Sequence, residues 1–100
     1  MSSLIGRLYS NEAQAVTVLP DGSETEEVPD RPVVLAGSFN PLHRGHERLL
    51  GIAEDVARRP GVYEISIINV DKPPIEQDEL ERRLRQFRGK ATALVTRAPL

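Results

Sequence analysis

The stretch Gly37-Ser38-Phe39-Asn40-Pro41-Leu42-His43-Arg44-Gly45-His46 decides the fold of this 100-residue chain. Four apolar residues, 33–36, come before it and a helical pattern follows it, which predicts a buried strand, a tight turn and a helix. Asn40-Pro41 suits a helix start, because Asn caps helices well and Pro fits their first position. Free N–H groups and the dipole at such a start favour an anion. We interpret the stretch as a phosphate site.

Two histidines and two glycines supply its chemistry. His43 and His46, three residues apart, share a helical face, and each can donate a hydrogen bond to a phosphate oxygen. Gly37 lets the backbone approach a ligand closely, and we expect Gly45, which lies between the histidines, to leave room for a nucleotide against the helix. Two histidines at this spacing could also bind zinc, but no further ligand is evident nearby, so no metal site is predicted.

From Pro32 onward, strands and helices alternate. A helix after the motif carries an apolar stripe of Leu49, Ile52, Ala53 and Val56. A second strand follows over 62–70, then a helix over about 76–88 and a third strand over 91–96. This order predicts an α/β fold: a Rossmann-like β-α-β-α-β parallel half-sheet with strand order 3-2-1. Ligands bind at the carboxyl ends of such strands, where the motif begins.

Residues 1–30 form a different segment. They hold six acids against Arg7, whereas residues 31–100 hold twelve bases and nine acids. A strand over 13–19, a Pro20-Asp21-Gly22-Ser23 turn and a second strand over 24–28 predict a β-hairpin or linker. An isolated hairpin is marginal in water, so it either packs on the domain over residues 31–100 or is the tail of a preceding domain. The second placement is slightly favoured.

Composition limits the classes of protein. The length fits one small domain, and no apolar run approaches the roughly 18–20 residues of a membrane span. No signal peptide is recognised and cysteine is absent, so we expect a cytoplasmic protein without a membrane partner. Nucleic-acid binding is opposed by the weak positive charge of residues 31–100 and by only four aromatic residues.

The motif resembles a known family. GSFNPLHRGH is similar to the G-x-F-[ND]-P-x-H-x-G-H signature of the nucleotidylyltransferase superfamily, the HxGH-motif adenylyl- and cytidylyltransferases. A bare HxGH also occurs in class I aminoacyl-tRNA synthetases, but the Phe39-Asn40-Pro41 lead-in looks like the small adenylyltransferases. Pro41, where lipid-precursor cytidylyltransferases usually carry a bulky apolar residue, favours ATP over CTP. The segment 64–74 further resembles a cytidylyltransferase-like, nicotinamide-nucleotide adenylyltransferase-like subgroup.

The resemblance implies an enzyme that transfers a nucleotidyl group. A phosphorylated acceptor, such as a pyridine mononucleotide, would attack the α-phosphorus of ATP or CTP and release pyrophosphate with Mg²⁺. His43 and His46 would be catalytic, and the nucleotide would lie against a second set of residues: Gly37, Ser38, Phe39, Asn40 and Gly45. Asn69 and Lys72 follow the second strand and are weaker candidates for acceptor binding.

The resemblance covers residues 32–100, roughly the first half of the family fold. The family's later S-[ST]-T-x-x-R motif, which clamps the phosphates, has no match in residues 47–100. We therefore expect a truncated domain carrying the HxGH half of the site. The rest would come from self-association or from covalent continuation past Leu100. The alternative is a non-catalytic nucleotide-binding fragment or folding unit.

Overall fold

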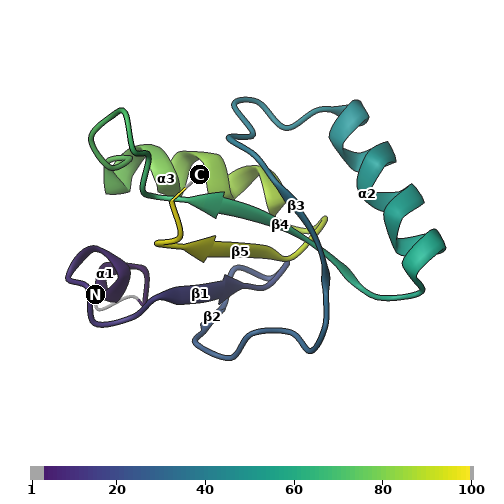
Figure 1. Cartoon of the computed structure of the whole chain (residues 1–100), viewed down its shortest axis with the longest axis horizontal. Coiled ribbons are helices and arrows are strands. Elements are labelled where there is room, and N and C mark those ends of the chain that lie inside the picture. Colours follow the sequence, from purple (N-terminus) through teal and green to yellow (C-terminus); the bar gives the residue numbers. More distant parts are fainter. Residues whose placement is uncertain (1–3, 100) are drawn as a thin grey trace.

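A five-stranded mixed sheet organises this α/β domain, whose computed structural model describes residues 4–99 (Figure 1). The strands lie in the order β2-β1-β5-β4-β3. The elements, in chain order, are α1 (Leu4–Tyr9), β1 (Ala15–Val18), β2 (Glu24–Thr25), β3 (Val33–Ala36), α2 (Arg44–Ala57), β4 (Gly61–Ser66), α3 (Gln77–Leu84), a 3₁₀ turn (Arg85–Phe87) and β5 (Ala93–Thr96).

The parallel part of the sheet confirms the predicted order. β3 pairs with β4 and β4 pairs with β5, both parallel, so the three predicted strands lie in the order 3-2-1. The registers place Leu35 beside Tyr63 and Tyr63 beside Ala93. These side chains point to one face of the sheet, because successive residues of a strand alternate between faces.

The predicted hairpin is present and belongs to the same sheet. β1 and β2 are antiparallel, and the turn between them holds Gly22 at φ +90°, a conformation that favours glycine. β1 then pairs antiparallel with β5 over four residue pairs. The hairpin thus packs on the α/β unit, the first of the two placements considered, and it makes the sheet mixed rather than wholly parallel.

Helix α1 was not predicted. Its first backbone N–H groups, those of Leu4 and Ile5, donate to the Glu24 carboxylate at 2.8 and 3.3 Å. An acid at a helix N-terminus is favourable, but this one comes from β2 rather than from the residues just before the helix. The side chain that accepts these N–H groups is therefore distant in sequence from the helix.

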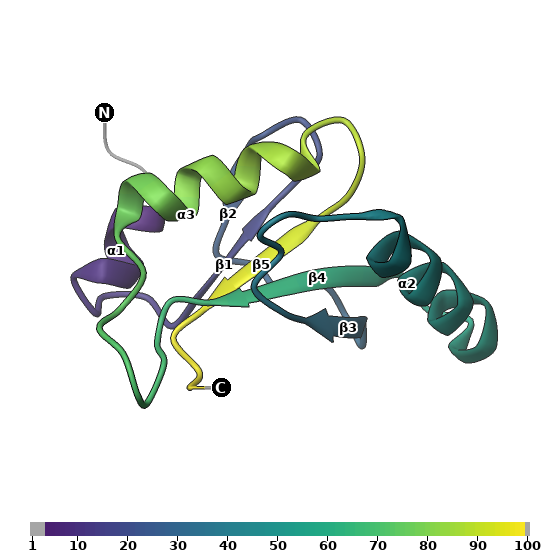
Figure 2. The same cartoon turned by 90° about the horizontal axis from the view of Figure 1, so that it is seen from above.

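The hydrophobic core lies between one face of the sheet and helices α1 and α3, which share that face (Figure 2). Ile5 and Leu8 enter it from α1. Leu80, Leu84 and Phe87, whose spacing of four and three residues predicts one apolar face of the second helical segment, are all buried. None of the helices within residues 4–99 is long and apolar enough to cross a membrane.

The first strand and helix of the parallel unit differ from prediction. β3 is an edge strand with Val34 45% exposed, so it is not buried on both faces. The expected apolar stripe of α2 also faces solvent, with Leu49, Ile52 and Val56 exposed by 53, 54 and 81%.

The reason is the way α2 is attached. It extends away from the sheet (Figures 1 and 2). Its fixed side is that of Leu50, which is buried, and Glu54, whose carboxylate accepts a hydrogen bond from the Gly61 N–H at 2.7 Å.

Candidate functional site

The loop from β3 to α2 is anchored by Phe39. This side chain is 2% exposed, and its ring meets those of Tyr63, Phe87 and His46 edge-on, with centroid distances of 5.1, 5.7 and 4.9 Å. Its φ of +49° lies in the left-handed region, which costs a non-glycine residue roughly 1–2 kcal/mol. The aromatic contacts hold this conformation, so Phe39 is placed in the core beside His46.

Side chains of α3 and the turn after it hold the same loop from the other side. The Gln86 amide donates to the Phe39 carbonyl at 2.7 Å and accepts from the Leu42 N–H at 2.8 Å. The Arg82 guanidinium donates to Asn40 Oδ1 at 2.9 Å, and that of Arg83 to the Ser38 carbonyl at 3.4 Å. The loop is thus fixed by a second element distant in sequence.

The helix begins later than predicted. Its N-cap is His43, with extended backbone, and its first residue is Arg44. The predicted capping residue, Asn40, lies before the helix, and the Asn40–Pro41 peptide bond is cis. The prediction was wrong because a histidine, which is not a favoured N-cap residue, takes the capping position here.

Both histidines cap the helix reciprocally. Nδ1 of His43 accepts from the Gly45 N–H at 3.0 Å, and Nδ1 of His46 accepts from the His43 N–H at 3.1 Å. These N–H groups were expected to remain free for an anion, but they bond to the imidazoles instead. A neutral imidazole that accepts at Nδ1 carries its proton on Nε2. The pair therefore has two Nε2–H donors at the positive end of the helix dipole.

The two rings lie against each other, with centroids 3.7 Å apart and planes inclined by 23°. Burial, and then the charge of His43, lower the pKa of His46 from its ordinary value of 6.5. His46 is thus neutral at pH 7 and can donate a hydrogen bond through Nε2. Two stacked rings at this distance disfavour double protonation, because like charges repel.

Gly45 is required by His43. A Cβ on Gly45 would lie 2.8 Å from Cε1 and 3.0 Å from Nδ1 of the His43 ring. The position of a Cβ on Gly45 is therefore occupied by that ring, and a side chain at residue 45 would displace it.

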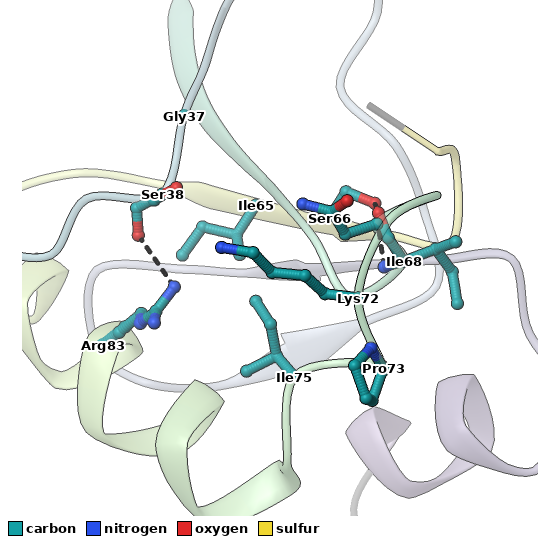
Figure 3. Close-up of a pocket in the computed structure, with 10 residues that line it drawn as sticks. Gly37, Ser38, Ile65, Ser66, Ile68, Lys72, Pro73, Ile75 and Arg83 are labelled. Carbon is teal, nitrogen blue, oxygen red and sulfur yellow. Dashed lines mark hydrogen bonds between the residues drawn. The ribbon is translucent and has the colours of Figure 1, made fainter.

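A cavity of about 160 Å³ lies where β3 and β4 end (Figure 3). It brings together four residues that the sequence singled out: Gly37, Ser38, Asn69 and Lys72. In Figure 3 the Lys72 side chain extends across the cavity towards Ser38. Asn69 also forms a local turn, since its Oδ1 accepts from the Asp71 N–H at 2.9 Å.

Sequence reasoning missed Arg83, the second cation of this cavity. Arg83 forms an ion pair with Glu79 at 2.8 Å, and an acid four residues before an arginine predicts a solvated helix face rather than a cavity. The Arg83 side chain is only 15% exposed. The hydrogen bonds from Arg82 and then Arg83 lower the pKa of Glu79 to about 2. The i,i+4 pattern alone could not reveal that one arginine of the series turns towards the sheet.

The histidines do not line this cavity. The loop runs back over the sheet, and Leu42 and Glu47 instead border a cleft of about 370 Å³ with Lys90 and Thr92, next to β5. The motif therefore begins at the carboxyl edge, where Gly37 and Ser38 line the cavity, but His43 and His46 do not line it. Gln86 holds Leu42 away from that edge.

The described residues, 4–99, contain no group of three or more His, Cys, Asp or Glu side chains arranged to hold a metal ion. The site consists of two parts that share one loop: the cavity with Ser38 and Lys72, and the paired imidazoles beside Phe39. No family model, no curated protein and no solved structure matches this chain.

Proposed function

We propose that this chain binds a nucleoside triphosphate through His43 and His46 and contributes to nucleotidyl transfer. The observation that carries the proposal is the reciprocal cap, which uses Nδ1 of both imidazoles at a helix N-terminus and leaves Nε2–H as their donor. Such donors, together with the helix dipole, suit a polyphosphate. In this proposal β3-α2-β4-α3-β5 is a Rossmann-like nucleotide-binding half, and ATP is the preferred nucleotide, with CTP second.

The chemistry asks little of the protein beyond position and charge. A phosphate oxygen of the acceptor attacks the α-phosphorus, the bond from that phosphorus to the bridging oxygen breaks, and pyrophosphate leaves. The attacking oxygen is already ionised at neutral pH, so no general base is required. The imidazoles stabilise the charge that develops on the phosphate oxygens. Magnesium enters as part of the substrate, bound to the triphosphate.

The cavity beside Lys72 and Arg83 suits the acceptor. Two cations and the Ser38 hydroxyl can bind a phosphate, and the apolar wall of Ile65 and its neighbours can pack against an uncharged ring. The two parts meet at the loop, where Ser38 lines the cavity and Phe39 contacts His46. A pyridine mononucleotide is a suitable acceptor for the test.

The second candidate is nucleotide binding without transfer. It is favoured by the separation of the histidines from the cavity and by the absence, in residues 47–100, of the family's second phosphate-binding motif. In that case the chain would hold a triphosphate on His43 and His46 but would not release pyrophosphate.

The test measures ATP binding by calorimetry and pyrophosphate release with nicotinamide mononucleotide, with CTP in place of ATP as a second arm. His46→Asn is the decisive variant, because Asn keeps an acceptor at the position of Nδ1 and can still cap, but it has no Nε2 donor. We expect folded His46→Asn to lose about 10²–10³ in rate, the typical cost of one such donor. Binding without pyrophosphate release would leave only the second candidate, and absence of binding by the wild-type chain would overturn both.

A further inference from the structure

We propose that Gln86 is the positioning residue of the histidine pair: its side-chain amide sets the place of the loop that carries His43 and His46. Its role in transfer rests on the proposed function, whereas its effect on the imidazoles can be measured without any nucleotide.

The Gln86 amide is fully engaged. Its Nε2 donates to the carbonyls of Phe39 and Arg83, at 2.7 and 3.0 Å, and its Oε1 accepts from the Leu42 N–H at 2.8 Å. Only one orientation of the amide is compatible with these partners. A flipped amide would turn its oxygen towards two carbonyls and its NH₂ group towards an N–H. The side chain is therefore a fixed bracket between two loop residues.

Gln86 binds backbone groups of two loop residues, and each of these residues adjoins one of the histidines. Leu42 immediately precedes the N-cap residue His43, and Phe39 forms the aromatic wall against His46. A shift of Leu42 would move His43, the N-cap residue. A shift of Phe39 would expose the His46 ring, whose pKa is lowered by burial. When a mutation distant from the reacting atoms displaces a catalytic group by about 1 Å, the rate of the reaction can fall about a hundredfold.

The neighbouring arginines are weaker supports. Arg82 contacts Asn40 from an exposed position, and Arg83 contacts the Ser38 carbonyl at a long distance of 3.4 Å. Exposed charged contacts contribute little because water and salt screen them. The Gln86 contacts are half-buried and involve backbone groups, which are costly to leave unpaired.

Gln86→Met tests the inference, because methionine keeps the length of the side chain, adds no charge and removes all three hydrogen bonds. Gln77→Met, at the opposite end of α3, is the matched control. Nitrogen-15 spectra of the histidine rings report which nitrogen carries the proton, and amide hydrogen exchange reports on the Leu42 N–H. Urea unfolding verifies that each variant is folded.

In the wild-type chain and in Gln77→Met, both rings are expected as the Nε2–H tautomer. In Gln86→Met we expect both histidine rings to be mixtures of tautomers. The Leu42 amide is expected to exchange about tenfold faster and ATP to bind about tenfold more weakly, because each of these changes corresponds to the loss of one hydrogen bond. Should Gln86→Met be unfolded, Gln86→Glu keeps the acceptor for Leu42 and loses both donations, and the tautomer mixture is then the readout.

The outcomes separate the two proposals. A folded Gln86→Met with unmixed tautomers and wild-type ATP affinity would overturn the positioning role while leaving nucleotide binding intact. Mixed tautomers in a protein whose wild-type form binds no ATP would keep the positioning role and overturn the proposed function.

Discussion

Replacing Gly45 by alanine is expected to affect the stability of α2 only slightly but to change the geometry of its imidazoles. The added Cβ would lie 2.8 Å from Cε1 of His43, closer than Cβ contacts occur, so the ring must move and its cap is lost. Loss of an N-cap costs about 0.5–2 kcal/mol. Alanine in place of helical glycine gains about 0.5–1 kcal/mol. The free energy of unfolding is therefore expected to change by between about −1.5 and about +0.5 kcal/mol.

The effect on binding is expected to be larger. A displaced His43 removes one hydrogen bond to a charged phosphate, worth about 1.5–3 kcal/mol, or about tenfold to a hundredfold in affinity. Urea unfolding and ATP calorimetry on the same sample measure both quantities. Gly51→Ala is the control, because it lies in the same helix and its Cβ would meet nothing within 4 Å. It is expected to be stabilised and to bind normally. Gly45→Ala with wild-type affinity would refute the assignment of His43 to the phosphate site.

Three further predictions concern the supports of the site. Gly61→Ala is expected to destabilise the fold by about 1–3 kcal/mol in urea unfolding, because its Cβ would lie 2.7 Å from Leu50; wild-type stability would show that α2 can shift freely. Phe39→Ala is expected to lower the free energy of unfolding by about 3–5 kcal/mol, because it removes a buried aromatic ring. It is also expected to return the pKa of His46 towards 6.5 in an NMR titration, and an unchanged titration would mean that the Phe39 ring does not set that pKa. The pKa of His46 is lower in the folded state, so its contribution to stability is complete above about pH 6.5 and is lost as pH falls through the folded value. The resulting fall in the free energy of unfolding is expected to be absent from His46→Asn when unfolding is measured between pH 7 and 4.5.

The parallel order of three strands was predictable because it depends on patterns that neighbours in sequence create. Residues 33–36 are a short apolar run, residues 61–66 include Val62, Tyr63 and Ile65, and a helical segment separates them; such units form parallel pairs. The buried face of α3 followed from the spacing of Leu80, Leu84 and Phe87. Local periodicity was sufficient for both.

The features that failed depend on contacts distant in sequence. The apolar stripe of α2 was expected to face the sheet, but the Glu54–Gly61 hydrogen bond and buried Leu50 turn the other side inward. Helix α1 is capped by Glu24 from another element. At the site, the two histidines and their spacing were visible in the sequence, but their reciprocal capping was not, because histidine is not a favoured capping residue. The hydrogen bonds of Gln86 were not visible either, because they join residues 44 and 47 positions apart.

The pairing of β1 with β5 has a consequence for how the chain folds. It joins Ala15 to Thr96, nearly the two ends of the described chain. A contact of such long range must close a large loop before it stabilises anything, which slows folding. During synthesis β1 is made early but cannot pair with β5 until β5 has been made. The αβ unit can therefore form first. The hairpin is therefore expected to dock last, and to be the first segment to detach when the protein begins to unfold.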